Sequence, residues 1–187
     1  MEFNEIREYL MENGSAERAE KMKTVAPGAK KIYGNTMPQL NELAKLIKDG
    51  GFELVEALWK GGAYEEKMLA AKLLHHLCKK DPVKAIALVK KYGAGIDNWA
   101  VCDTLGMQSL KPINKKYGKE IFALAEELAS SANMWERRLS MVLLEDFTKQ
   151  PALHPRILQM VNKHRSDTEY YIKKAVKWLD AALDKHR

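Results

Sequence analysis

A repeat of about 35 residues constrains this chain more than any other feature of its sequence. Four aligned segments begin with an aromatic residue, and these residues lie 35, 36 and 36 positions apart: Tyr64, Trp99, Trp135 and Tyr171. Apolar residues follow each of them at helical spacing, and no segment alternates between apolar and polar residues as a strand does. A helical repeat of this length is typical of a solenoid, in which each helix pair buries its apolar face against the next. We therefore predict an all-α protein of stacked helix pairs.

Capping residues, glycines and prolines divide the chain into about ten or eleven helices. Thr36 and Asp81 each precede a helix with a proline in its first turn, where proline is well tolerated. The predicted helices run from Phe3 to Gly14, Ser15 to Pro27, Thr36 to Gly50, Phe52 to Trp59, Tyr64 to Cys78, Asp81 to Tyr92, Asp97 to Leu110, Gly118 to Leu128, Asn133 to Phe147, Pro155 to Asn162 and Asp167 to Leu183.

The composition fits one domain spanning residues 1–187, with 46% hydrophobic and 30% charged residues. The net charge of +6 is compatible with a polyanionic partner but does not identify one. The only two cysteines, Cys78 and Cys102, cannot form a disulfide framework and fit a reducing compartment. There is no apolar run long enough to cross a membrane, and the acidic start lacks the layout of a signal peptide. We therefore expect a cytoplasmic protein that does not contact membranes.

The segment 97–103, Asp-Asn-Trp-Ala-Val-Cys-Asp, contains the first candidate for chemistry. If Asp97 is the N-cap of a helix, Trp99 and Asp103 lie four residues apart on one helix face. Asp103 then lies beyond the first turn, so neither capping nor the helix dipole accounts for its carboxylate. The alternative is that Trp99 belongs to the core and Asp103 is a solvated neighbour.

Cations recur at one position of the repeat. Three residues after each aligned aromatic residue stand Lys67, Cys102, Arg138 and Lys174. Because equivalent positions in a solenoid point the same way, we expect three of these to form a positive stripe on its concave surface. Tyr171, Lys174 and Trp178 also share one face of the last helix, although Trp178 alone would fit the core equally well. Aromatic residues interleaved with cations suit a nucleic-acid backbone and its sugars or bases.

Other candidates for chemistry are weak. His75 and His76 are adjacent, so they project to different sides of a helix and do not chelate a metal as an i, i+4 pair does. Cys102 has no evident base beside it and reads as a small core residue. The Gly93-Ala94-Gly95 segment follows no strand and is not a dinucleotide fingerprint. No cofactor and no metal site is predicted.

The order of three short blocks, NWxxxD, MWERR and YYIKKAVKW, resembles the DNA alkylation repair family, the AlkD-like DNA glycosylases built from HEAT-like repeats. The resemblance covers about Tyr33 to Trp178 and includes the helix opened by Gly34 to Pro38. It implies a right-handed solenoid of HEAT-like repeats with a concave basic groove. Only nine residues follow Trp178, so the helices that extend the groove in longer members are expected to be absent.

The resemblance also implies roles for individual residues. Asp103 would be the catalytic carboxylate, and Trp99, Trp178 and Arg138 would bind the substrate. The residues expected to contact the DNA backbone are Arg137, Lys174, Lys67 and Tyr171. The implied reaction is excision of 3- or 7-alkylpurines from double-stranded DNA by a monomeric, monofunctional glycosylase.

Such a purine is already cationic and leaves without a general acid, so one carboxylate could both stabilise the oxocarbenium sugar and position the water. Two alternatives remain open from the sequence. The first is a non-catalytic module for damaged or branched DNA. The second is a protein-interaction scaffold, since the fold alone does not determine function.

Overall fold

The computed structural model describes residues 1–186. Within them the regular structure is entirely helical, which confirms the predicted all-α class. None of the helices in residues 1–186 is both long and apolar enough to cross a lipid bilayer. The helices are α1 (Phe3–Glu12), α2 (Ala16–Val25), α3 (Met37–Leu46), α4 (Gly51–Gly61), α5 (Tyr64–Leu77), α6 (Pro82–Gly93), α7 (Trp99–Gln108), η1 (Lys111–Ile113), α8 (Gly118–Leu128), α9 (Met134–Leu143), η2 (Glu145–Lys149), η3 (Pro151–Leu153), α10 (His154–Lys163) and α11 (Tyr170–Lys185).

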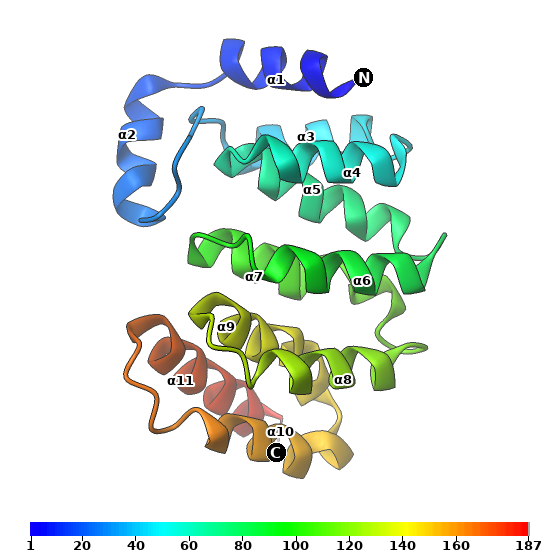
Figure 1. Ribbon diagram of the computed structural model, residues 1–187, viewed down its shortest axis with the longest axis vertical. Helices are drawn as coiled ribbons and strands as arrows, with labels where there is room; N and C mark the ends of the chain where they lie inside the picture. Colours follow the sequence, from blue (N-terminus) through cyan, green and yellow to red (C-terminus); the bar gives the residue numbers. More distant parts are fainter. Residues whose placement is uncertain (187) are drawn as a thin grey trace.

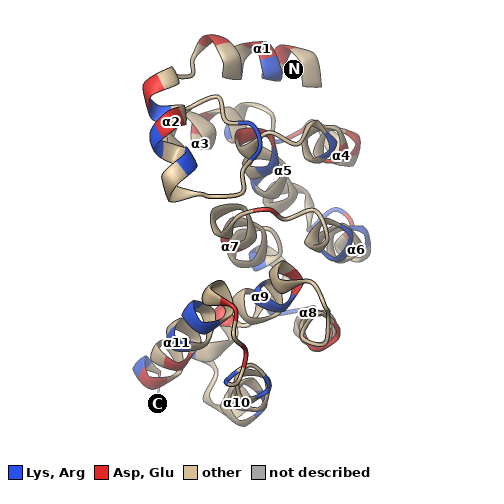
Figure 2. Cartoon of the chain, turned by 60° about the vertical axis from the view of Figure 1, so that its left-hand side comes forward, with Lys and Arg blue, Asp and Glu red and all other residues tan. Residues whose placement is uncertain are grey.

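The helices stack in two rows along the long axis of the molecule (Figure 1). Helices α5, α7, α9 and α11 form one row, in which each helix packs on the next. Helices α4, α6, α8 and α10 form the second row, and Figure 2 shows α4, α6 and α8 nearly end-on beside the first row. The aligned aromatic residues of the sequence occupy the first or second position of the four helices in the first row. The repeat is therefore a repeat of helix pairs.

The N-terminal part is held to this stack by two fully buried carboxylates at the start of α5. Glu65 accepts backbone N–H bonds from Tyr33, Gly34 and Asn35 at 2.9, 2.7 and 3.2 Å. Glu66 accepts from Arg7 Nε at 2.8 Å and from the Tyr33 hydroxyl at 3.0 Å. A buried carboxylate is costly unless its oxygens are satisfied. These bonds therefore fix the connector that runs between α2 and α3.

The helix ends follow the local sequence, apart from α3, which ends at Leu46 rather than near Gly50, α11, which begins at Tyr170 rather than at Asp167, and two further corrections. The predicted helix from Asn133 to Phe147 ends earlier, because α9 stops at Leu143 and the chain continues in the short η2. There the Thr148 hydroxyl donates to the carbonyl of Glu145, and the Phe147 ring packs edge-on against Phe122 at 5.0 Å. Tertiary packing therefore overrides helical spacing in this segment. The second correction concerns the start of α7 and is described with the site.

Candidate active site

A pocket of about 330 Å³ opens between α7, α9 and α11. These helices are neighbours in one row, as Figure 2 shows. Helix α7 contributes its first residue and the residue one turn later, α9 contributes an arginine, and α11 contributes the rest. The lining residues are Trp99, Asp103, Arg138, Tyr170, Tyr171, Lys174 and Trp178. The pocket thus unites the carboxylate, both tryptophans and part of the cation set that the sequence singled out.

Asp103 and Arg138 form a two-point ion pair at the wall of this pocket. Arg138 Nε donates to Asp103 Oδ1 and Arg138 Nη2 donates to Asp103 Oδ2, each at 2.9 Å. The third guanidinium nitrogen, Nη1, donates to the backbone carbonyl of Tyr171 at 2.7 Å. The Arg138 side chain is only 9% exposed, whereas the Asp103 side chain is 24% exposed. Arg138 therefore fixes the orientation of Asp103, while the carboxylate keeps an open side.

The charge of this pair is stabilised within the site. Burial by itself lowers the pKa of Arg138, but the hydrogen bonds to Asp103 and its negative charge outweigh this effect. The pKa of Arg138 therefore lies above its ordinary value, and the guanidinium stays charged. Each of the three guanidinium nitrogens donates a hydrogen bond to a protein oxygen, and the expected contact of Arg138 with the substrate stays a prediction.

The start of α7 explains why Trp99 and Asp103 share a face. Asn98 is the N-cap, and its side-chain oxygen accepts the N–H of Val101 at 3.0 Å. The prediction of Asp97 as the cap was wrong by one residue. Asp97 instead accepts hydrogen bonds from Lys67 Nζ at 2.6 Å and from Asn98 Nδ2 at 2.7 Å. Trp99 is the first residue of α7, so Asp103 follows one turn later on the same side.

Aromatic rings line the pocket around this carboxylate. Trp99 is half-buried, and its Nε1 donates to the backbone carbonyl of Val25 at 2.6 Å, which ties α7 to the end of α2. Tyr170 is exposed and lies edge-on to Tyr171 at 5.1 Å, with Lys174 Nζ 5.5 Å from its ring centre. Trp135 lies outside the pocket lining and packs on Tyr171 at 4.9 Å.

The sequence did not single out Tyr170 as a site residue. The signal was present, because Tyr170 lies four residues before Lys174 and eight before Trp178, on the same helix face. The alignment of the repeat pointed instead to the adjacent Tyr171 as the DNA contact.

Two predicted backbone contacts do not line the pocket. Arg137 Nε donates to Asp167 at 2.9 Å, and its Nη1 donates to the carbonyls of Ser131 and Ala132. Lys67 is buried, and its Nζ donates to Asp97 and, at 2.9 Å, to the carbonyl of Gly95. Lys67 ties α5 to the loop before α7, and Arg137 ties α9 to the loop before α11, so their charges are already engaged.

The expected stripe of cations is also not an exposed one. Of its four positions, Cys102 is fully buried, Lys67 and Arg138 are buried, and only Lys174 is exposed. The register explains the difference: counted from the first residues of α7, α9 and α11, it is Asp103, Arg138 and Lys174 that occupy the same position. A carboxylate thus takes the place that the aromatic alignment gave to Cys102. Burial raises the pKa of the Cys102 thiol well above its ordinary value, which makes it a poor nucleophile.

Metal ligands do not gather in the part of the chain that the structure describes. Residues 1–186 contain no group of three or more His, Cys, Asp or Glu side chains that could hold a metal ion. His75 Nδ1 lies 2.8 Å from the carbonyl of Gln108, and its ring packs edge-on to His76.

Comparison with known proteins places the chain. The family model described as DNA alkylation repair enzyme matches residues 6–186. Among solved structures, a predicted DNA alkylation repair enzyme from Enterococcus faecalis superposes with a TM-score of 0.81 at 16% identity, covering 93% of this chain and 84% of that one. Comparison with curated proteins gives no match. Because the family model spans nearly the whole chain, this protein belongs to the DNA alkylation repair enzyme family.

Proposed function

We propose that the protein is a monofunctional DNA glycosylase that excises cationic 3- or 7-alkylpurines by hydrolysing the N-glycosidic bond. The observation that carries the proposal is the placement of Asp103. Its carboxylate is oriented by Arg138 on one side and open to a pocket on the other, and the same pocket is lined by Trp99 and Trp178. Family membership supports DNA as the substrate.

The chemistry requires few groups because the alkylated base is already a good leaving group. Positive charge on the purine weakens the glycosidic bond, so no general acid has to protonate the base. As the bond breaks, positive charge develops on the sugar as an oxocarbenium ion. The open oxygens of Asp103 stabilise this charge electrostatically and accept a hydrogen bond from the attacking water.

Arg138 acts as a positioning residue in this proposal. Two parallel hydrogen bonds hold the carboxylate more strictly than one, because planar guanidinium and carboxylate groups match in geometry. The positive charge of Arg138 weakens the electrostatic stabilisation that Asp103 gives to the cationic sugar. The indole rings of Trp99 and Trp178 offset this loss, because their π-faces attract a cation by about 0.5–2 kcal/mol for each contact.

The DNA strand would lie along the row formed by α5, α7, α9 and α11. Lys174 is exposed at the pocket and is the cation best placed to pair with a phosphate, with Tyr170 and Tyr171 beside it. We expect little phosphate contact from Lys67 and Arg137, whose charges are engaged by Asp97 and Asp167. We also propose that the protein is a monomer, that its fold is a HEAT-like solenoid and that its substrate is double-stranded DNA.

A non-catalytic DNA-binding module is the second candidate, and the same ion pair favours it. If Asp103 served only to hold Arg138 in place, the pocket would grip a sugar without cleaving its bond. Release of the base separates the candidates. Purified protein is incubated with duplex DNA containing 3- and 7-methylpurines, and free bases are quantified by chromatography against unmodified duplex.

Release of methylpurines from methylated duplex alone supports the glycosylase. Binding of duplex at low salt without release supports the binding module. The absence of both would leave a protein-interaction scaffold and contradict the proposal.

A further inference from the structure

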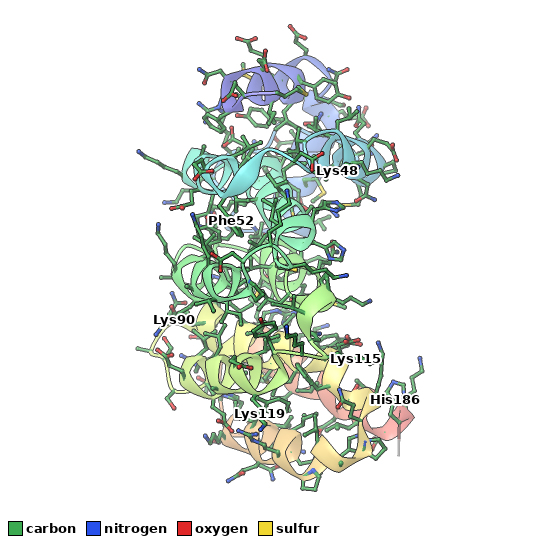
Figure 3. All side chains as sticks on the ribbon, turned by 90° about the vertical axis from the view of Figure 1, so that its right-hand side faces the viewer. Lys48, Phe52, Lys90, Lys115, Lys119 and His186 are labelled. Carbon is green, nitrogen blue, oxygen red and sulfur yellow. The ribbon has the colours of Figure 1, made fainter. Side chains whose placement is uncertain are left out.

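A second, larger pocket of about 720 Å³ lies where α5 and α7 end. Its walls come from α3, α5, α7 and the two short helices η1 and η2. Figure 3 faces this end of the stack, with Lys48 and Lys115 on one side and Phe52, Lys90 and Lys119, which belong to α4, α6 and α8, on the other. The residues used below are Lys72 and His75 of α5, Met107 and Gln108 of α7, and Lys111 of η1.

Lys72 is an unusual wall residue. It is only 8% exposed, and its ammonium makes one hydrogen bond, to the neutral Oε1 of Gln108 at 3.3 Å. In the part of the chain that the structure describes, no carboxylate lies within ion-pair distance of it. Burial lowers its pKa. An ammonium in this position costs the fold free energy that one long hydrogen bond to an amide does not return.

Two of the three carboxylates that line the pocket form ion pairs. Glu42 accepts Lys45 Nζ at 2.7 Å. Asp146 accepts Lys149 Nζ at 2.6 Å and Asn114 Nδ2 at 3.1 Å. Glu145 is the remaining carboxylate of the lining, against two cations, Lys72 and Lys111, for which no ion pair with a described residue is found. The charge of Lys111 lowers the pKa of Asp146, so among the described residues the buried Lys72 ammonium is the lysine of the lining with no carboxylate near it.

The two pockets follow the same face of α7. Trp99 and Asp103 line the first pocket, and Met107, one turn further, lines the second. Gln108, which contacts Lys72, follows Asp103 by five residues, or about 7.5 Å along a helix axis at 1.5 Å per residue. One bound duplex, whose major groove alone is about 12 Å wide, therefore spans both sites.

We infer that the Lys72 pocket binds a backbone phosphate of the duplex whose lesion sugar lies at Asp103. The inference rests on the proposed function, because it takes the sugar position from it. Lys72 provides a buried charge and Lys111 a second, exposed one. His75 and Met107 form the walls beside them. The ligand is a phosphodiester, and no base is read.

The test is the salt dependence of binding to an unmodified 15-base-pair duplex. Each phosphate neutralised by a lysine contributes about 0.9 to the slope of log affinity against log salt. Lys72→Met keeps the aliphatic stem and removes the charge, and it should lower this slope by about 0.9 and the affinity at 0.1 M salt by about eightfold. Lys79→Met is the matched control, because Lys79 is exposed in the same region without lining the pocket.

Two further measurements keep the result interpretable. The thermal midpoint of Lys72→Met should be unchanged or higher, since a buried charge is removed, and Lys72→Arg should retain the slope of the wild type. An unchanged slope and affinity in Lys72→Met would overturn the inference, as would an equal loss in Lys79→Met. If the wild type releases no alkylpurine while Lys72→Met still lowers the slope, the glycosylase proposal fails and the phosphate subsite stands.

Discussion

Arg138 and Asp103 are joined by two parallel hydrogen bonds of 2.9 Å, from a side chain of α9 to a side chain of α7. A further bond of 2.7 Å from Arg138 to the carbonyl of Tyr171 brings in α11. One guanidinium thus joins three successive helices of the row at the pocket. The residue that the sequence presents as a substrate contact is thus the ion-pair partner of Asp103, the carboxylate that we propose to be catalytic.

Substitution of Arg138 by lysine tests this positioning role. Lysine keeps the charge but cannot make the two-point contact, so the Asp103 carboxylate loses its fixed orientation. A misplacement of about 1 Å costs about 100-fold in rate, and we expect a loss of this size in single-turnover excision of methylpurine. The salt slope of DNA binding should remain that of the wild type.

Lys174→Met provides the contrasting result for the same pair of measurements. Lys174 is exposed at the pocket, so this variant should lower the salt slope by about 0.9. If Arg138→Lys also lowered the slope and left the rate intact, Arg138 would be a phosphate contact and the positioning role would be wrong.

The buried carboxylate of Glu65 should dominate the stability of the N-terminal part. Glu65→Gln replaces an oxygen that accepts backbone N–H groups by an amide that cannot accept from all three. Hydrogen bonds to charged groups contribute about 1.5–3 kcal/mol each, so we expect a loss of about 2–4 kcal/mol in the free energy of unfolding. Urea denaturation measures it.

The matched control is Glu17→Gln on the exposed face of α2, where the ion pair with Lys21 is open to solvent. This substitution should change the free energy of unfolding by less than about 0.5 kcal/mol. Equal effects of the two substitutions would show that the bonds to the connector do not stabilise the fold.

His164 should make the protein less stable in mild acid. It is buried, and its Nε2 has no hydrogen-bond partner among residues 1–186. Burial lowers its pKa; the charge of Asp167 opposes this, and the charges of Arg137 and Lys163 add to it. The unfolded chain therefore binds a proton more readily than the folded one, so stability is complete above about pH 6.5 and falls as the pH drops below it.

The expected loss is at most about 1.4 kcal/mol per pH unit until the folded-state pKa is reached. Urea denaturation at pH 7.5, 6.0 and 5.0 should show a flatter pH dependence in His164→Gln than in the wild type. Parallel curves for the two proteins would assign the acid sensitivity to another group.

Much of the fold was readable from the sequence because local signals and packing agree. The helix from Gly118 to Leu128 has the predicted ends, and Thr36 caps α3 as expected, with its side chain accepting the N–H of Gln39. Local signals and packing disagree after Leu143. There the helical spacing of apolar residues continues but the helix ends, because Phe147 packs on Phe122. The right-handed HEAT-like geometry and the basic groove stay predictions.

The site was less readable, for a physical reason. Helical spacing places Trp99 and Asp103 on one face, and the structure brings them to a pocket with Trp178. Spacing does not say which carboxylate a cation meets. The partners of Lys67, Arg137 and Arg138 lie 30, 30 and 35 residues away in sequence, across a helix pair. Three cations that looked free are therefore paired.

Substitution of Asp103 by asparagine is the decisive test of whether this carboxylate drives excision. The amide keeps the size of the side chain and removes the negative charge that the oxocarbenium sugar requires. The measurement is the single-turnover release of 7-methylguanine from duplex DNA, with the affinity for the same duplex determined in parallel. We expect release to be lost while the affinity stays within about twofold of the wild type. Release at the wild-type rate would contradict this expectation.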